Sequence, residues 1–135
     1  MAGSGACALL PAPTVATTIG AREATPAASS QGEFESCAYA LATTGGHGTL
    51  YLDTANTRGT AIYQAALSTL GFSPVSGVGD AAAYNAHDGR FILRAGDGFV
   101  GLTIPVDLAG SRLTTPHGAQ GAAVTLARVV LGNLD

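Results

Sequence analysis

The chain has 135 residues, of which 47% are apolar and 11% charged, and its formal net charge is −3. This length predicts one domain, and the apolar content predicts a packed core rather than a disordered chain. The basic residues are all arginines and do not cluster, so we expect binding neither to nucleic acid nor to an anionic membrane surface. No run of about 18 apolar residues occurs, so we expect no membrane insertion.

The first elements are predicted from proline, glycine and the spacing of apolar residues. Residues 9–20 predict a short helix with its prolines in the first turn and Gly20 as its left-handed end. Residues 21–32 are expected to form a loop rich in Ala, Ser and Pro. Residues 33–42 alternate, with Cys37, Tyr39 and Leu41 on one face, as in a half-buried strand. A turn over 43–48 leads to a second strand over 49–54.

The second half repeats this order. A helix capped by Asn56 or Thr57 runs to about Leu70 and stops at Gly71. A loop over 72–80 precedes strands over 81–86, 90–95 and 99–104, and the Asp-Gly pairs between these strands favour tight hairpins. A last helix, capped by Thr115 with Pro116 at its first position, ends at Gly132.

The two halves share a helix–strand–strand pattern. Thr17-Thr18-Ile19-Gly20 matches Ser68-Thr69-Leu70-Gly71, and Cys37-Ala38-Tyr39-Ala40 matches Ala82-Ala83-Tyr84-Asn85. We therefore predict an α+β domain over residues 7–135 with two such repeats, a fifth strand and a C-terminal helix. The sheet should be antiparallel, with the helices packed on one face. Residues 1–6, which lack the features of a signal peptide, are expected to form a flexible lead.

Two cysteines, Cys7 and Cys37, lie 30 positions apart without the paired spacing of a zinc site. They are either two buried free thiols or one disulfide that ties the N-terminal segment to the first strand. Disulfides persist in oxidising compartments. The low charge and the absence of lysine fit an exported protein.

Several residue patterns suggest a chemical function, but each of them also has a structural explanation. Residues 77–82 satisfy GxGxxA, but the strand before this motif contains proline and no full helix follows, so a turn is favoured over a nucleotide site. The three histidines, at 47, 87 and 117, sit beside glycines in turns or at a helix start, so we expect no metal. Glu33 and Glu35 share one face of a strand, and an exposed face explains them better than paired catalysis. We expect no enzymatic activity and no cofactor.

Tyrosines are the favoured binding groups because each has an apolar ring and a polar tip. Tyr39, Tyr51 and Tyr84 are candidate ligand-binding residues, with the alternative that Tyr39 and Tyr84, which share a repeat position, belong to the core. The glycine-rich segment adds Gly77, Gly79 and Asp80 as candidates.

The chain resembles a large group of actinobacterial cell-envelope lipoproteins of uncharacterised function. The resemblance is carried by Cys7-Ala8-Leu9-Leu10, by the helix ending at Gly20, by Cys37-Ala38-Tyr39 and by the segment 75–82, followed by Phe91-Ile92-Leu93-Arg94. It implies export, a Cys7–Cys37 disulfide, and an α+β domain like extracytoplasmic sensor or binding modules. It carries over no catalytic residues. The six residues before Cys7 do not show the apolar export segment that precedes lipid attachment in that family.

Two functions are therefore expected from different classes. The first is a non-enzymatic extracytoplasmic domain that binds a small ligand, an envelope component or a protein partner through the uncovered sheet face or the loop over 72–80. The second is a structural or self-assembling surface protein, in which exposed strand edges pair copies into a homo-oligomer.

Overall fold

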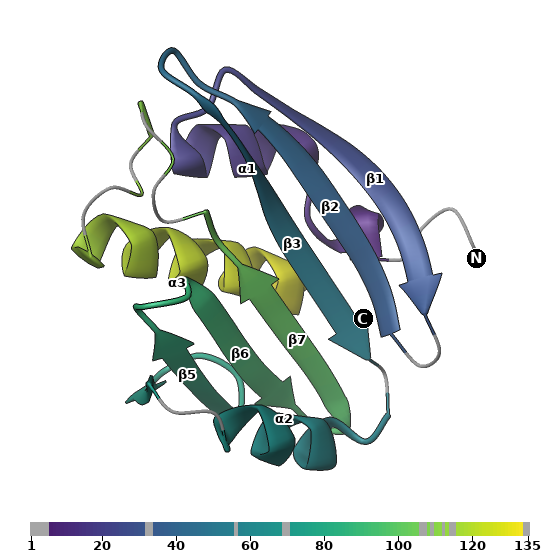
Figure 1. Ribbon diagram of the computed structural model, residues 1–135. Coiled ribbons are helices and arrows are strands. Elements are labelled where there is room, and N and C mark those ends of the chain that lie inside the picture. Colours follow the sequence, from purple (N-terminus) through teal and green to yellow (C-terminus); the bar gives the residue numbers. More distant parts are fainter. Residues whose placement is uncertain are drawn as a thin grey trace.

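A single antiparallel sheet organises the chain (Figure 1). The computed structural model describes residues 6–31, 34–55, 57–68, 71–105, 108, 110–111, 113 and 116–133. Its elements are η1 (Ala6–Leu9), α1 (Ala12–Ile19), β1 (Glu23–Gln31), β2 (Phe34–Ala42), β3 (His47–Ala55), α2 (Gly59–Leu67), β4 (Phe72–Val75), β5 (Ala81–Asn85), β6 (Arg90–Ala95), β7 (Gly98–Thr103) and α3 (Pro116–Gly132). The strand order is β1-β2-β3-β7-β6-β5-β4, antiparallel throughout. The predicted α+β class and antiparallel sheet are confirmed.

The sheet has two more strands than the five predicted, and both are edge strands. Segments expected to be loops form β1 and β4. Both contain a proline, Pro26 in β1 and Pro74 in β4, and proline is tolerated in a sheet where its strand lies at the edge. Neither strand has the apolar alternation of a half-buried strand, because an edge strand needs less burial. Each predicted repeat is therefore a helix followed by three strands.

One face of the sheet carries the larger core, covered by η1, α1 and α3. Every second strand residue points into this core. Examples that are fully buried are Tyr39, Leu52, Phe91 and Leu102. Val15 and Ile19 of α1 pack there, as does the Ala119, Ala123, Leu126 and Val130 stripe of α3. The Thr115 cap predicted for this helix lies outside the described residues.

Helix α2 packs on the opposite face, which corrects the expectation that all helices share one face. Its Tyr63 joins Ile92 and Phe99 in a second, smaller core, while the neighbours of Ile92, Phe91 and Leu93, face the first core. The physical reason is that the middle residues of β5, β6 and β7 are buried on both faces. A continuous apolar run of this kind needs cover on both sides.

The N-terminal segment is fastened to the sheet at several points. The Sγ atoms of Cys7 and Cys37 are 2.04 Å apart, which forms the expected disulfide between η1 and β2. The Tyr39 hydroxyl donates a hydrogen bond to the Leu10 carbonyl oxygen at 2.6 Å. The side-chain amide of Asn133 donates one to the Leu9 carbonyl oxygen at 3.0 Å. Residues 1–5 of the predicted lead lie outside the described residues, whereas Ala6 begins η1 and is buried.

No helix in the described part of the chain is long and apolar enough to cross a membrane.

Candidate functional site

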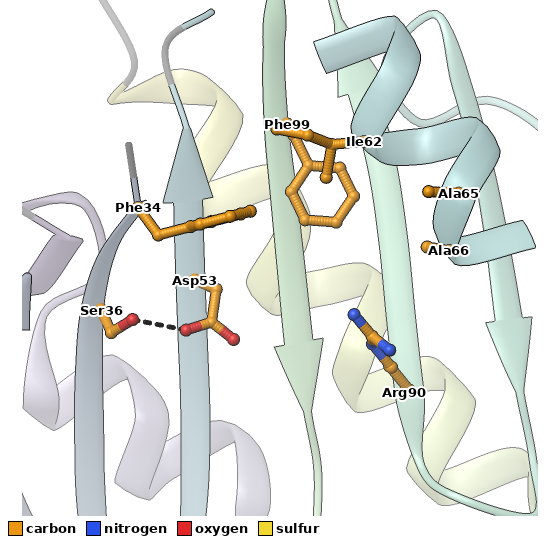
Figure 2. Close-up of a pocket in the computed structure, with 8 residues that line it drawn as sticks. All are labelled: Phe34, Ser36, Asp53, Ile62, Ala65, Ala66, Arg90 and Phe99. Atoms are coloured by element: carbon orange, nitrogen blue, oxygen red, sulfur yellow. Dashed lines mark hydrogen bonds between the residues drawn. The ribbon is translucent and has the colours of Figure 1, made fainter. Parts of the chain in front are cut away.

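An open groove of about 590 Å³ lies on the face of the sheet that carries α2. Helix α2 lies over β6 and β7 (Figure 1) and does not cover β2 and β3. The groove lies beside the helix, and Figure 2 shows the residues that line it. Pockets for small ligands commonly have volumes of about 300–1,000 Å³. The lining residues come from β2, β3, α2, β6 and β7, and are Phe34, Ser36, Asp53, Ile62, Ala65, Ala66, Arg90 and Phe99.

The apolar end of the groove is made by two aromatic rings and one side of α2. The rings of Phe34 and Phe99 meet edge to face, with centroids 6.4 Å apart and planes at 88°. Such an arrangement is favourable for aromatic pairs. Ile62 lies beside Phe99 in Figure 2, and Ala65 and Ala66 follow along the helix. Their small side chains keep the groove open on that wall.

A carboxylate stands on the opposite wall. Asp53 of β3 is partly buried, and the Ser36 hydroxyl of β2 donates a hydrogen bond of 2.5 Å to its Oδ1 (Figure 2). The two residues are register partners on neighbouring strands, so the sheet itself fixes this contact. The second oxygen, Oδ2, accepts no hydrogen bond within the described part of the chain and can receive a donor from a ligand.

A guanidinium completes the polar part of the groove. Arg90 at the start of β6 is partly buried, and its side chain has no hydrogen bond or ion pair with the described residues. Figure 2 shows Asp53 and Arg90 on either side of β7. A partly buried charge without a partner is costly, so Arg90 is the best-placed cation for an anionic group of a ligand.

Gly101 of β7 lies between Asp53 and β6 in the strand register. It pairs with Asp53 on β3 and with Ile92 on β6, so it lies in the middle of the sheet, where glycine weakens a strand and often marks a close approach. A Cβ atom here would lie 3.2 Å from the Phe99 ring. The missing side chain thus leaves room for that ring.

The predicted tyrosines are divided between the two faces of the sheet. Tyr39 and Tyr84 are buried in the larger core, at 0% and 4% exposure, which is the core role left open by the sequence. Tyr51 is 48% exposed. It lies on the groove face, where Tyr51 and Arg90 are both register partners of Thr103. Tyr51 is therefore the one candidate tyrosine placed near the groove.

Gly77, Gly79 and Asp80 form a turn away from the groove lining. Gly77 and Gly79 have φ of 82° and 63°, and a Cβ atom on Gly79 would lie 2.8 Å from the Arg94 carbonyl oxygen. The Asp80 carboxylate accepts from the Gly96 amide at 2.7 Å and is 3.7 Å from the Arg94 guanidinium. Strand β5 follows rather than a helix, so the GxGxxA match serves as a turn into a strand.

The buried Tyr39 hydroxyl leads to a testable expectation about alkaline pH. Burial raises the pKa of Tyr39 to about 12, above its ordinary value of 10.0, so the folded state keeps a proton that the unfolded chain loses. This contribution to stability is complete below pH 10 and is lost as the pH rises toward 12. We expect Tyr39→Phe to lower the free energy of unfolding by about 1 kcal/mol at neutral pH, through the lost hydrogen bond to Leu10, and to weaken the alkaline decline.

Urea denaturation at about pH 8 and about pH 11 measures both effects. Tyr51→Phe is the matched control, because its exposed hydroxyl should alter neither value. Burial also raises the pKa of Tyr63 and of Tyr84, so part of the decline remains in Tyr39→Phe. A decline identical to that of the parent protein would contradict the burial of this hydroxyl.

Metal binding finds no support in the residues that the structure describes. Among them, no group of three or more His, Cys, Asp or Glu side chains is close enough to hold an ion. Glu33 lies outside the described residues, and Glu35 is exposed.

The groove residues were missed because the sequence patterns draw attention to the core. Asp53 lies next to the end of the strand predicted over 49–54, and Arg90 is the first residue of the one predicted over 90–95, so neither position by itself indicates a site. The sequence contains two signals. Asp53 and Arg90 alternate with the apolar residues of their strands and so lie on the opposite face, and Gly101 interrupts a strongly apolar strand. A glycine inside such a strand is typical of a site where something approaches the backbone closely.

No protein-family profile, curated protein or solved structure matches the chain.

Proposed function

We propose that the protein is a non-enzymatic, extracytoplasmic cell-envelope domain that binds a small amphiphilic ligand in the groove beside α2. The observation that supports this most directly is Arg90, which is partly buried and pairs with none of the residues that the structure describes, in a groove that also holds Asp53 and an aromatic end. Orienting polar groups in a mainly apolar hollow are typical of ligand sites.

The extracytoplasmic location is part of the same proposal. The Cys7–Cys37 disulfide supports it, because such bonds are rare in a reducing cytosol. The resemblance to actinobacterial envelope lipoproteins points the same way. Counting free thiols in denatured, unreduced protein from its native source tests the location, and two reactive thiols per chain would argue against it.

Binding in the groove is testable by amide chemical shifts in NMR titrations with benzyl alcohol, 2-phenylethylamine, 3-phenylpropanoate and L-phenylalanine. We expect shifts at the amides of Asp53, Ile62 and Gly101, and none at Gly77 or Gly79. Ala65→Trp places a large ring on the exposed rim of the groove and should lower the affinity about tenfold or more, because the ring takes the ligand's place.

Gln64→Trp is the matched control, since Gln64 is exposed on the same helix but does not line the groove. It should bind like the parent protein. Shifts that cluster elsewhere, or equal affinities for the two tryptophan variants, would overturn the groove as the binding site.

A second function, self-assembly through a sheet edge, is favoured by β1. This nine-residue strand lies at the edge of the sheet, and its residues 25–30 are exposed and uncharged, a pattern that permits strand addition. Light scattering after size exclusion separates the two functions, because a monomer at high concentration counts against self-assembly and leaves groove binding intact.

A further inference from the structure

The groove holds two opposite charges that do not neutralise each other. Asp53 is on β3 and Arg90 on β6, with β7 between them. Asp53 pairs with Gly101, whereas Arg90 pairs with Thr103 two residues further along β7, so their Cα atoms are roughly 12 Å apart. No ion pair joins them in the described part of the chain. Each is partly buried and each keeps free hydrogen-bonding capacity. A ligand that carries both charges can satisfy both groups at once.

The ligand's own charges must lie close together. Two charge-assisted hydrogen bonds of about 2.8 Å, with a similar distance between the ligand's ammonium nitrogen and carboxylate oxygen, span roughly 8 Å in total. Figure 2 shows the Arg90 side chain between β6 and β7, on the side of its own strand that faces Asp53. The gap between the two charged groups is therefore shorter than the gap between their Cα atoms. This span suits an ammonium and a carboxylate attached to the same carbon atom.

The remaining part of the groove selects an apolar substituent. Phe34, Phe99 and Ile62 gather at one end, with Phe99 only 2% exposed. No charged side chain belongs to that end of the lining, and Ala66 leaves space beside the rings. An apolar side chain placed there removes its own surface and the exposed parts of Phe34 and Ile62 from water.

We propose that the groove binds an α-amino-acid group with an apolar side chain. The ammonium donates to the Asp53 carboxylate, the carboxylate accepts from the Arg90 guanidinium, and the side chain packs against Phe99 and Ile62. This inference rests on the proposed binding function and names the ligand class. Ser36 serves as a positioning residue, because its hydrogen bond fixes the Asp53 carboxylate and leaves Oδ2 toward the groove.

The test compares ligands that each lack one charge. L-phenylalanine carries both, 2-phenylethylamine lacks the carboxylate, and 3-phenylpropanoate lacks the ammonium. We expect L-phenylalanine to bind about tenfold more tightly than either, since each charged hydrogen bond contributes about that factor. The dipeptide Gly-L-Phe, with its charges farther apart, should bind more weakly, which distinguishes a free amino acid from a peptide.

Two charge-removing variants give opposite patterns if the assignment is right. Asp53→Asn should weaken L-phenylalanine and 2-phenylethylamine about tenfold and leave 3-phenylpropanoate unchanged. Arg90→Gln should weaken L-phenylalanine and 3-phenylpropanoate and leave 2-phenylethylamine unchanged. Both positions are partly exposed, and amide spectra confirm that each variant is folded.

The outcomes separate this inference from the function on which it rests. If all probes, including neutral benzyl alcohol, shift the groove amides with equal affinity, the amino-acid assignment is overturned and the groove remains a binding site. The same holds if each variant weakens all ligands equally. If none of the probes shifts the groove amides at millimolar concentration, both proposals fail.

Discussion

Replacing both cysteines with alanine, C7A/C37A, is expected to lower the free energy of unfolding by about 3–4 kcal/mol in the chain-entropy treatment of disulfides. The bond closes a loop with a sequence separation of 30 residues, and removing it frees the unfolded chain. Urea denaturation of the oxidised protein and of the variant, followed by far-UV circular dichroism, measures the difference. The folded variant should keep its sheet, because the other contacts of η1 remain.

Those contacts include two hydrogen bonds at the N-terminal segment. The Tyr39 hydroxyl donates to the Leu10 carbonyl oxygen, and the Asn133 side-chain amide donates to the Leu9 carbonyl oxygen. They hold the same segment that the disulfide fastens, so we expect the effects of C7A/C37A and Tyr39→Phe to be coupled rather than additive. The control is the parent protein in reductant, which should approach the stability of C7A/C37A once thiol counting shows full reduction. Unchanged stability after full reduction would argue against a stabilising role for the bond.

The fold could be predicted from the sequence where burial is one-sided. The strand around Tyr39 alternates clearly, and Gly20, with φ of 87°, ends α1 as its residue type predicts. Prediction failed where burial is absent or two-sided. Strand β1 is an edge with little apolar content, and the run Phe91-Ile92-Leu93 is buried on both faces. The alternation of apolar and polar residues identifies a strand only when one of its faces is exposed to solvent and the other is buried.

The candidate site was less predictable than the fold, for a physical reason. Phe34, Asp53 and Arg90 come from three strands whose register is fixed by pairing, and no local pattern encodes which residues become neighbours across a sheet. The side of the sheet on which α2 packs is also decided by tertiary structure. Tyr51, which the sequence suggests as a binding residue, lies on the groove face but outside the groove lining.

Gly59→Ala is expected to lower the free energy of unfolding by about 3 kcal/mol and to weaken binding in the groove. Gly59 starts α2 pressed against the β6–β7 turn, where its amide donates to the Asp97 carbonyl oxygen at 2.8 Å. A Cβ atom would lie 2.5 Å from the Gly98 carbonyl oxygen and 2.7 Å from that of Asp97. Because backbone atoms cannot rotate aside as a flexible side chain can, the helix must move away, carrying Ile62 and Ala66 out of the groove wall.

Gly121→Ala makes the same chemical change in another helix and should have the opposite sign. Gly121 lies inside α3 with nothing within 4 Å of an added Cβ, so alanine should stabilise the protein by about 1 kcal/mol through helix propensity. Urea denaturation gives both stabilities, and the L-phenylalanine titration gives both affinities. Equal stability of the two variants would show that α2 is not seated tightly on the turn. A destabilised Gly59→Ala protein that binds normally would show that the α2 wall does not contribute to the site.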